Sequence, residues 1–545
     1  MARDSIHSMI SLPTLPALLE QLGRPAVPKR LSMLQIAIVL IAGGAHAASI
    51  AWPFAFAGGL GQPLWWLQLL ALALLVRQLD GCRSPKRAAW LGGLFATAMQ
   101  CGTSWWLFIS MHDYGGLAAP LTVLAIVLLA AALGLYYAVA GALFVKLAPR
   151  QPAPRALVFA ALWLLAELAR VKFFTGFPWG EGGYAHVDGW ARPLAAWIGV
   201  HGLTFLAAFV AAWLALSWRA RRTRWLSMGV TALLSLALAW LPVHSGVNLD
   251  ASAPPPGTLS VTLLQGNIAQ EEKFQGGTGV ATALRWYGEQ LQGAKSALVV
   301  APETALPVLP QQLPEGYLQA LQARFATGEQ AALIGLPLGS YEAGYTNSVV
   351  GLKPGSAAAN SYSYNKHHLV PFGEFIPWGF RWFTRLMQIP LGDFNRGAVG
   401  QASFDWQGQR LAPNICYEDL FGEELGARFV DAALAPTIFV NVSNIGWFGN
   451  TVAIDQHLLI SRMRSLEFDR PMIRATNTGA TVIIDHRGEV THSLPRYTRG
   501  ALVGEVQGRA SITPYAWWVA RYGLWPLLVL SLAVLGLGLL LRRRR

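Results

Sequence analysis

Long apolar runs separated by short polar stretches fill the chain up to about residue 245, and one more apolar run lies near the C-terminus. The eight runs lie at about 33–50, 57–76, 89–109, 119–145, 155–174, 194–217, 225–243 and 523–541. A run of this length can cross the hydrocarbon core of a bilayer as one helix. The pattern therefore predicts seven membrane spans within residues 32–244 and an eighth span at 522–541.

The stretch from 258 to 508 has a different pattern, in which short β-rich runs alternate with helical stretches. Strands are predicted at Leu259–Leu264, Ala297–Ala301, Ala331–Gly335, Ser348–Leu352, Ala357–Tyr364, Leu411–Ile415, Thr437–Val440, Ile473–Thr476 and Thr481–Ile484. Helices are predicted at 277–294, 314–327 and 453–468. A linker-like segment, Ala251–Gly257, precedes this stretch. Such alternation indicates an α/β or α+β layered domain.

The composition supports a membrane protein and weakens one other interpretation. Hydrophobic residues make up 53% of the chain, charged residues make up 13%, and the mean hydropathy is +0.38, which excludes an ordinary soluble protein. A formal net charge of +13 is also typical of proteins that bind nucleic acid. However, the basic residues cluster in the short loops between the apolar runs. We therefore expect a membrane, and no nucleic acid, as the partner.

The distribution of basic residues between loops predicts the topology. The tails at 1–31 and 542–545 are basic, whereas the loops around 51–56 and 111–118 contain no Lys or Arg. Basic loops are retained on the cytoplasmic side of a membrane. Both termini are therefore predicted to be cytoplasmic, and the domain at 258–508 is predicted to lie on the outer, periplasmic side.

Cys416 lies at a predicted strand-to-helix corner. The acidic residues Glu418 and Asp419 suit the first turn of a helix. Backbone N–H groups at such a corner can lower the pKa of a thiol and so make it reactive. The other cysteines, Cys82 and Cys101, lie far away in the sequence, so a disulfide framework is excluded. A buried cysteine that acts only as a small hydrophobe is the alternative.

Two other polar residues end strand-like runs, where α/β folds tend to build sites. Glu303 ends the run that starts at Ala297, and Lys366 follows the run that ends near Tyr364. Together with Cys416 they form a coherent set for acyl transfer. The thiolate attacks, the carboxylate moves the proton, and the ammonium and backbone N–H groups stabilise the oxyanion. Taken singly, a capping glutamate and a solvated lysine are the plainer interpretations.

We expect neither a cofactor nor a metal ion. His367 and His368 are adjacent, so their side chains point in different directions, and no third ligand is spaced to join them. The sequence has no G-x-S-x-G elbow that would support a serine hydrolase.

Three motifs resemble the catalytic blocks of the nitrilase, or carbon–nitrogen hydrolase, superfamily. They are Pro302-Glu303 after a strand, Asn365-Lys366 followed by Pro371-Phe-Gly-Glu374, and Cys416-Tyr-Glu418. The resemblance implies an αββα sandwich with a Glu-Lys-Cys triad. The expected fold is therefore a polytopic α-helical membrane domain of about eight spans plus an α/β nitrilase-like αββα sandwich domain.

Further motifs make the chain similar to the bacterial apolipoprotein N-acyltransferase family. They are Phe174-Thr-Gly-Phe-Pro-Trp179, Gln265-Gly-Asn-Ile268 and Thr513-Pro-Tyr515. The resemblance covers nearly the whole chain from about residue 30.

The resemblance assigns roles to the residues of the three blocks. It implies that Glu303 is the general base, Lys366 the oxyanion stabiliser and Cys416 the nucleophile. Glu374 and Glu418 match further acidic positions of the family and would orient the triad and the substrate.

Other residues are expected to form the walls of the site. Tyr417 would form part of the wall beside the nucleophile. Phe274 stands where the family often has Trp, and with Trp378 it is expected to bind substrate. The aromatic segment Phe375–Phe383 is either a lid that enters the bilayer surface or a buried core loop.

The resemblance implies a two-step acyl transfer at the outer face of a bacterial inner membrane. A phospholipid, by resemblance phosphatidylethanolamine, gives an acyl chain to Cys416 as a thioester. The acceptor is the α-amine of the N-terminal diacylglyceryl-cysteine of an apolipoprotein. One alternative is a membrane-anchored hydrolase (amidase) that passes the acyl group to water. The other is a transporter or scaffold, although the sequence shows no chain of intramembrane ionisable groups beyond Glu167 near Arg170.

Overall fold

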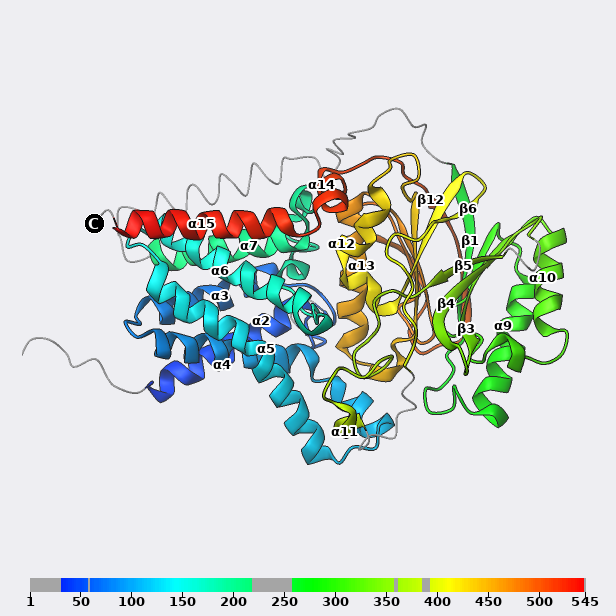
Figure 1. The fold of residues 1–545 in the computed structure, drawn as a ribbon, viewed down its shortest axis with the longest axis horizontal. Helices are drawn as coiled ribbons and strands as arrows, with labels where there is room; N and C mark the ends of the chain where they lie inside the picture. Colours follow the sequence, from blue (N-terminus) through cyan, green and yellow to red (C-terminus); the bar gives the residue numbers. More distant parts are fainter. Residues whose placement is uncertain (1–30, 57–58, 218–256, 357–360, 385–392, 544–545) are drawn as a thin grey trace, which may run out of the picture.

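The computed structural model describes residues 31–56, 59–217, 257–356, 361–384 and 393–543. Within these residues, a helical bundle lies next to a two-sheet α/β domain (Figure 1). The predicted span at 225–243 lies outside the described residues, as do residues 1–30 of the predicted N-terminal tail and nearly all of the predicted linker.

The long helices of the described part of the bundle lie at the positions of seven predicted spans. They are α2 (Met33–Ile50), α3 (Trp65–Asp80), α4 (Pro85–Ser104), α5 (Ala119–Leu147), α6 (Pro152–Lys172), α7 (Ala195–Ser217) and α15 (Trp525–Arg543). Four helical stretches are long and apolar enough to cross a membrane by length and composition: Met33–Ile50, Ala119–Leu147, Arg192–Ser217 and Trp525–Arg543. α3 begins later than predicted, because Gly61, with a positive φ, and Pro63 interrupt the apolar run.

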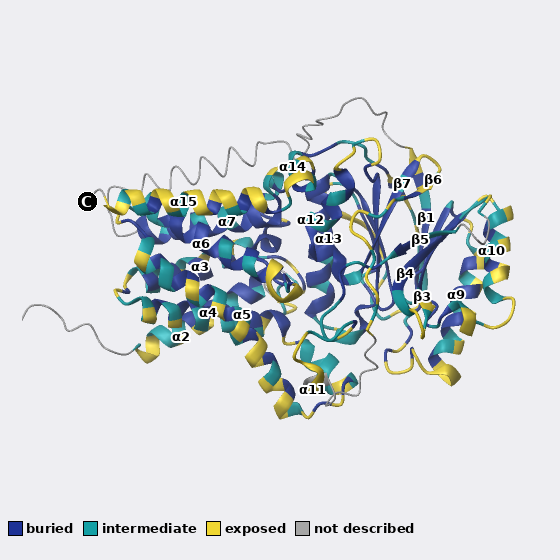
Figure 2. Ribbon diagram, viewed as in Figure 1, coloured by how far each residue is buried: buried dark blue, intermediate teal, exposed yellow. Residues whose placement is uncertain are grey.

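The bundle presents apolar side chains to its surroundings. Figure 2 shows exposed positions along the outer sides of α5 and α15. The exposed apolar residues of these two helices include Leu121, Val123, Leu124, Leu128, Leu135, Val529, Leu532 and Leu540. An exposed apolar face of this size is unfavourable in water. These faces therefore fit the hydrocarbon chains of a bilayer.

Two six-stranded sheets form the second domain. The first has the order β12 (Gly500–Gln507), β1 (Thr258–Gln265), β2 (Leu298–Val300), β3 (Ala331–Ser340), β4 (Gly344–Leu352) and β5 (Tyr362–Asn365). The second has the order β11 (Val490–Ser493), β10 (Val482–Ile484), β9 (Met472–Thr476), β8 (Ile438–Ser443), β7 (Gln409–Ile415) and β6 (Phe404–Trp406). The strands β1-β2-β3 and β7-β8-β9 are parallel, and the flanking pairs are antiparallel.

Helices cover the outer faces of both sheets, and the predicted αββα sandwich is confirmed (Figure 1). Apolar residues of both sheets, such as Val300 and Val440, form one core cluster between them. α9 (Ala281–Gly293) and α10 (Tyr317–Thr327) pack on the first sheet. α13 (Val452–Phe468) lies between the second sheet and the bundle, close to α12 (Gly422–Gly426) and α14 (Pro514–Tyr522), and the short α11 spans Arg381–Thr384.

Some elements differ from the prediction. β6, β11 and β12 were not predicted, because they are short or carry polar residues on an exposed face. The helix predicted after Ile415 is a single 3-10 turn, Cys416–Leu420, followed by the short α12. The strand predicted at Ala357–Tyr364 is β5, and residues 357–360 lie outside the described part.

α13 joins the two domains through buried hydrogen bonds. The side-chain carbonyl of Gln456 accepts from the indole N–H of Trp106 at 3.0 Å and from that of Trp179 at 2.8 Å. At the end of the same helix, the Glu467 carboxylate accepts from the N–H of Val200 at 2.7 Å. Separation of the two domains would leave these buried polar groups without partners, which is unfavourable. The contacts therefore fix the sandwich against the bundle.

Candidate active site

The three predicted catalytic residues follow the carboxyl ends of strands in both sheets. Glu303 follows β2 and Lys366 follows β5 in the first sheet, and Cys416 follows β7 in the second. Gly335 of β3 lets the chain around Glu303 approach closely, because a Cβ there would lie 2.2 Å from the carbonyl oxygen of Pro302. The sandwich thus brings together residues that are far apart in the sequence.

The Lys366 ammonium binds two carboxylates. Its Nζ lies 3.3 Å from Oε1 of Glu303 and 2.9 Å from Oε1 of Glu374. The side-chain amide of Asn347 donates to the same two oxygens, at 2.7 Å each. Burial alone would lower the pKa of Lys366, but Glu374 and Glu303 raise it above its usual value. Lys366 is therefore a charged group with a fixed position.

Glu303 is held as a carboxylate. Its second oxygen accepts from the backbone N–H of Asn444 at 2.7 Å. Burial would raise its pKa, but the Lys366 ammonium and the Asn347 hydrogen bond outweigh burial and hold the pKa below its usual value. Such a group can accept a proton in the reaction and return it later.

Cys416 lies on a tight corner, as predicted, with a φ of 53°. The prediction of a lowered pKa is wrong: burial and the neighbouring Glu303 carboxylate raise the pKa of the thiol to about 12, although Lys366 opposes them. A helix N-terminus would stabilise the thiolate through its backbone N–H groups. This effect is weak here, because a single 3-10 turn follows Ile415 instead of a helix. The resting thiol of Cys416 is therefore neutral, and it would need a base to act as a nucleophile.

Glu418 connects the two strand ends that carry Lys366 and Cys416. Its Oε1 accepts from the N–H groups of His367 at 2.6 Å and His368 at 3.3 Å. Its Oε2 accepts from the N–H of Ile415 at 2.7 Å and the hydroxyl of Tyr364 at 2.8 Å. Glu418 thus positions the neighbours of both residues, which fits its predicted orienting role.

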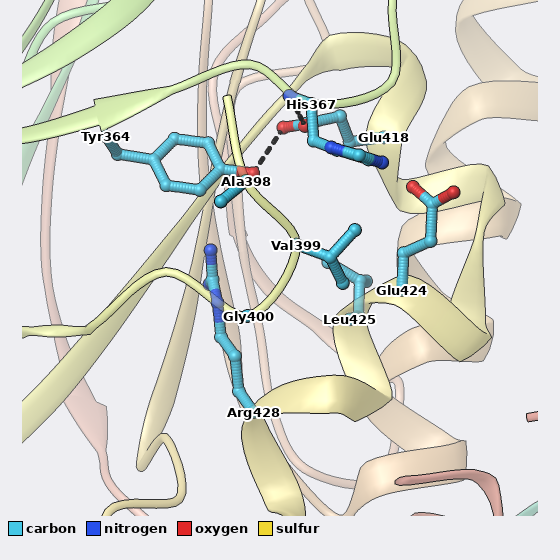
Figure 3. A pocket seen from close by; sticks show the side chains of 9 residues that line it. All are labelled: Tyr364, His367, Ala398, Val399, Gly400, Glu418, Glu424, Leu425 and Arg428. Carbon is cyan, nitrogen blue, oxygen red and sulfur yellow. Dashed lines mark hydrogen bonds between the residues drawn. The ribbon is translucent and has the colours of Figure 1, made fainter. Parts of the chain in front are cut away.

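A small cavity lies beside Glu418, and it is not lined by Glu303, Lys366 or Cys416. Figure 3 shows its lining, with the Tyr364 hydroxyl donating to Glu418. The lining residues are Tyr364, His367, Ala398, Val399, Gly400, Glu418, Glu424, Leu425 and Arg428. Its volume is about 20 Å³, which is space for about one water molecule. The cavity is therefore too small for a lipid.

Tyr417 and His368 connect the nucleophile turn to the membrane domain. The buried Tyr417 hydroxyl donates to the carbonyl of Gly176 at 3.2 Å. The His368 ring stacks on Phe421, with centroids 3.4 Å apart, and its Nε2 lies 2.8 Å from the carbonyl of Thr175. The loop after α6 thereby packs against the turn that holds Cys416.

The two predicted substrate-binding residues lie at the surface. Phe274 is 44% exposed and Trp378 is 99% exposed. Phe380 and Trp382 in the same segment as Trp378 are also exposed. The buried-loop interpretation of Phe375–Phe383 is therefore wrong, and a lid stays a prediction.

Sequence reasoning missed three residues of the site. Asn347 and Asn444 bind Glu303, as described above, and Lys273 donates to its backbone carbonyl at 3.1 Å. Asn347 lies inside a strand and Lys273 lies in the polar run Gln270-Glu-Glu-Lys273, which reads as a solvated loop. The neighbouring Gln265–Ile268 motif and the expected substrate contact at Phe274 indicated that this loop lies near a site.

The histidine pair predicted not to bind metal has separate partners. Nδ1 of His367 lies 2.7 Å from the carbonyl of Gly397, and Nδ1 of His368 lies 3.0 Å from the carboxylate of Glu424. Each ring therefore takes part in hydrogen bonds of the protein.

One group of possible metal ligands lies elsewhere, in and beside the bundle. It consists of Glu167, Glu181 and His201, all buried. The cationic Arg170 interacts electrostatically with both carboxylates and offsets part of their charge. Glu167 and Arg170, the ionisable pair noted in the sequence, thus have Glu181 from the loop before α7 and His201 from α7 as neighbours.

Comparisons with known proteins cover almost the whole chain. Residues 48–213 match the family model described as "Apolipoprotein N-acyltransferase N-terminal domain", and residues 260–515 match "Carbon-nitrogen hydrolase". A protein of Verminephrobacter eiseniae (strain EF01-2) named "Apolipoprotein N-acyltransferase" is 59% identical over 508 residues, which cover 90% of this chain and 93% of that protein.

A second protein with the same name, from Ralstonia nicotianae (strain ATCC BAA-1114 / GMI1000), is 44% identical and covers 88% of this chain and 90% of its own length. Among solved structures, a carbon-nitrogen hydrolase from Helicobacter pylori G27 aligns with 50% of this chain and 94% of its own, at 18% identity and a TM-score of 0.34. The two family models and the two relatives agree over most of the chain, and the chain belongs to the apolipoprotein N-acyltransferase family, with a carbon–nitrogen hydrolase domain at residues 260–515.

Proposed function

We propose that this N-acyltransferase moves an acyl chain from a membrane phospholipid, through a thioester on Cys416, to the N-terminal α-amine of a diacylated apolipoprotein. One observation carries the proposal. The Lys366 ammonium forms ion pairs with Glu303 and Glu374, and these charged groups interact electrostatically with Cys416. A base, an ammonium and a thiol in one buried site are what acyl transfer through a thioester requires. Membership of the family supports the choice of donor and acceptor.

In the first half-reaction, Glu303 takes the proton of the Cys416 thiol as the sulfur attacks the ester carbonyl of the phospholipid. The Lys366 ammonium and the backbone N–H groups of the nucleophile turn stabilise the oxyanion. When the C–O bond breaks, Glu303 gives its proton to the departing glycerol oxygen. The products are the acyl-enzyme and a lysophospholipid.

In the second half-reaction, the α-amine of the acceptor attacks the thioester. Glu303 takes a proton from the amine and returns it to the departing sulfur, so the free thiol of Cys416 is restored. The amide product is more stable than the thioester, so this step proceeds without ATP. Glu418 and Tyr417 act as positioning residues, because their hydrogen bonds fix the strand ends and the nucleophile turn.

The membrane domain brings the catalytic domain to its lipid substrates. The apolar outer faces of α5 and α15 support a location in the bacterial inner membrane. We assign residues 258–508 to the catalytic domain on the periplasmic side, with both termini in the cytoplasm, from the basic loops of the sequence. Phosphatidylethanolamine is the donor that we expect, on the family resemblance alone.

The exposed aromatic segment supports a lid at the bilayer surface. Trp378 and Trp382 are 99% and 62% exposed, and Trp is a residue that prefers the membrane–water interface. We assign to this segment, together with Phe274, contacts with the acyl chains of the substrates.

Depletion of the protein in cells tests the substrate assignment. We expect lipoproteins of depleted cells to carry a free α-amine on the diacylglyceryl-cysteine, and a plasmid copy to restore the third acyl chain. Mass spectrometry of the N-terminal lipopeptide measures both. Lipoproteins that remain triacylated in depleted cells, when no second such enzyme is present, would exclude this acceptor. Release of the acyl chain as a free fatty acid, which is transfer to water, would favour a hydrolase.

A further inference from the structure

Lys273 is a buried lysine that the mechanism above does not use. It lies in the turn after β1 and is 2% exposed. Its ammonium donates to the backbone carbonyl of Glu303 at 3.1 Å, and it interacts electrostatically with Glu303 and Cys416. Its Nζ also lies 6.0 Å from the centre of the Phe274 ring. A buried ammonium is unfavourable unless a nearby negative charge offsets it.

The charges of the site explain why a second cation lies there. Glu303 and Glu374 are two buried carboxylates, and both bind the single ammonium of Lys366. Proton transfer from the thiol to Glu303 then places a developing negative charge on Cys416. With Lys366 alone, the site would hold an excess of negative charge, which would disfavour both the ionised base and the attacking sulfur. Lys273 supplies the missing positive charge.

We propose that Lys273 is a positioning residue whose ammonium holds the chain at Glu303 and balances the second carboxylate, so that the first half-reaction slows when the ammonium loses its proton. This inference rests on the roles proposed above for Glu303 and Cys416. It adds a second buried cation beside Lys366, the one cation to which the family resemblance assigns a role.

The direction of the pH dependence follows from the surroundings of Lys273. Burial lowers its pKa to about 7, and Glu303 and Cys416 oppose this effect only in part. The ammonium is therefore present below pH 7 and is lost as the pH rises above it. The Lys366 ammonium and the Asn347 hydrogen bond hold the pKa of Glu303 below its usual value, so Glu303 does not change charge in this range. The Glu374 carboxylate pairs with the same ammonium. Glu271 and Glu272, on the turn of Lys273 itself, lie at exposed positions.

The test measures the first half-reaction alone, because the α-amine of the acceptor also titrates, with a pKa of about 8. Full-length protein in detergent is mixed with phosphatidylethanolamine, and acyl-enzyme formation is followed by intact mass between pH 6 and pH 8. For a single group with a pKa near 7, we expect the wild-type rate to fall about ten-fold over this range.

Three variants separate charge from structure. We expect Lys273→Met to be slow, with a rate that no longer falls with pH, and Lys273→Arg to keep its rate at pH 8, since Arg stays protonated. Lys295→Met, at an exposed position, is the matched control and should behave as wild type. Thermal unfolding of each variant shows whether the fold is intact.

Two results would overturn the inference. One is a rate of acyl-enzyme formation by the wild-type protein that does not fall between pH 6 and pH 8. This measurement needs no variant. The other is a folded Lys273→Met protein with the rate and pH profile of wild type. A wild-type protein that forms no acyl-enzyme at any pH would instead contradict the proposed function itself, so the two failures are distinguishable.

Discussion

The thiol of Cys416 is neutral at physiological pH, and this decides how the reaction begins. Burial and the Glu303 carboxylate raise its pKa to about 12, whereas Lys366 holds Glu303 ionised. A neutral thiol attacks poorly. In the proposed mechanism, attack is therefore coupled to proton transfer to Glu303, and the sulfur becomes strongly nucleophilic only in the presence of the substrate. A thiol of this kind also resists oxidation, because oxidation follows thiolate character.

Replacement of Glu418 by glutamine tests its positioning role. All four acceptor contacts of Glu418 come from N–H or O–H donors. The amide NH₂ of Glu418→Gln would face donors in either orientation, so we expect a loss of about 1–3 kcal/mol of stability and about a ten-fold slower acyl-enzyme formation. Thermal unfolding and single-turnover mass measurements check this.

Glu505→Gln, at an exposed position of β12, is the control for this change. Unchanged stability and rate in Glu418→Gln would show that the strand ends keep their positions without the carboxylate.

The triad could be predicted from the sequence, but its electrostatic environment could not. Glu303, Lys366 and Cys416 follow strand-like runs, and a strand end is visible in a sequence pattern. Lys273 and Asn347 carry no such signal, because their burial depends on how two distant sheets pack. The prediction for the pKa of the Cys416 thiol was wrong for the same reason. This pKa depends on burial and on the nearby Glu303 carboxylate, and both follow from the packing of the two sheets.

At the scale of elements, the strands that could be predicted are mostly the ones that are buried over most of their length. β2, β8, β9 and β10 are buried at every residue, and β1, β3, β4 and β7 are buried at most of theirs. β11 is exposed at all of its residues and β12 at several, so no hydrophobic period marks them. β11 and β12 form because they pair with the neighbouring strands β10 and β1, and the local sequence does not indicate them.

The proposed aromatic lid can be tested at the same scale. Removal of Trp378 and Trp382 together (Trp378→Ala, Trp382→Ala) deletes exposed rings, so stability should change by less than about 0.5 kcal/mol. Acyl-enzyme formation from vesicle phospholipid should fall about ten-fold, because the lid loses its contacts with the bilayer. Transfer from a short-chain soluble ester should be unaffected.

Tyr341→Ala, which removes another exposed ring, serves as the control for the lid variant. Equal losses with vesicles and with the soluble ester would place the two tryptophans in the chemistry rather than at the membrane.

At the scale of the whole molecule, the bundle also forms hydrogen bonds to residues in and beside the turn Cys416–Leu420. The loop after α6 offers the carbonyls of Thr175 and Gly176 to His368 and Tyr417, beside the nucleophile. The hydrogen bonds of Gln456 and Glu467 fix α13 against the bundle. The membrane domain therefore contributes to the geometry of the site as well as to its location. No local sequence pattern could predict these contacts between distant segments.

The proposed orientation predicts which side of the membrane is accessible. In a Cys416→Ser background, Leu434→Cys places a thiol at a position that is 68% exposed on the catalytic domain. We expect a membrane-impermeant maleimide to label it in intact spheroplasts. A cysteine appended after Arg545 should be labelled only after lysis. Labelling of the appended cysteine in intact spheroplasts, with protection of Leu434→Cys, would reverse the topology.

The acyl-enzyme on Cys416 is the central claim, and its mass tests it most directly. Purified wild type, Cys416→Ala and Glu303→Gln are incubated with phosphatidylethanolamine, weighed intact, and then given a peptide that carries an N-terminal diacylglyceryl-cysteine. We expect wild type to gain the mass of one acyl chain and to lose it to the peptide, and Cys416→Ala to do neither. Glu303→Gln should form the adduct at least about 100-fold more slowly. Acylation of the peptide by Cys416→Ala, or by wild type that never carries the adduct, would contradict the account.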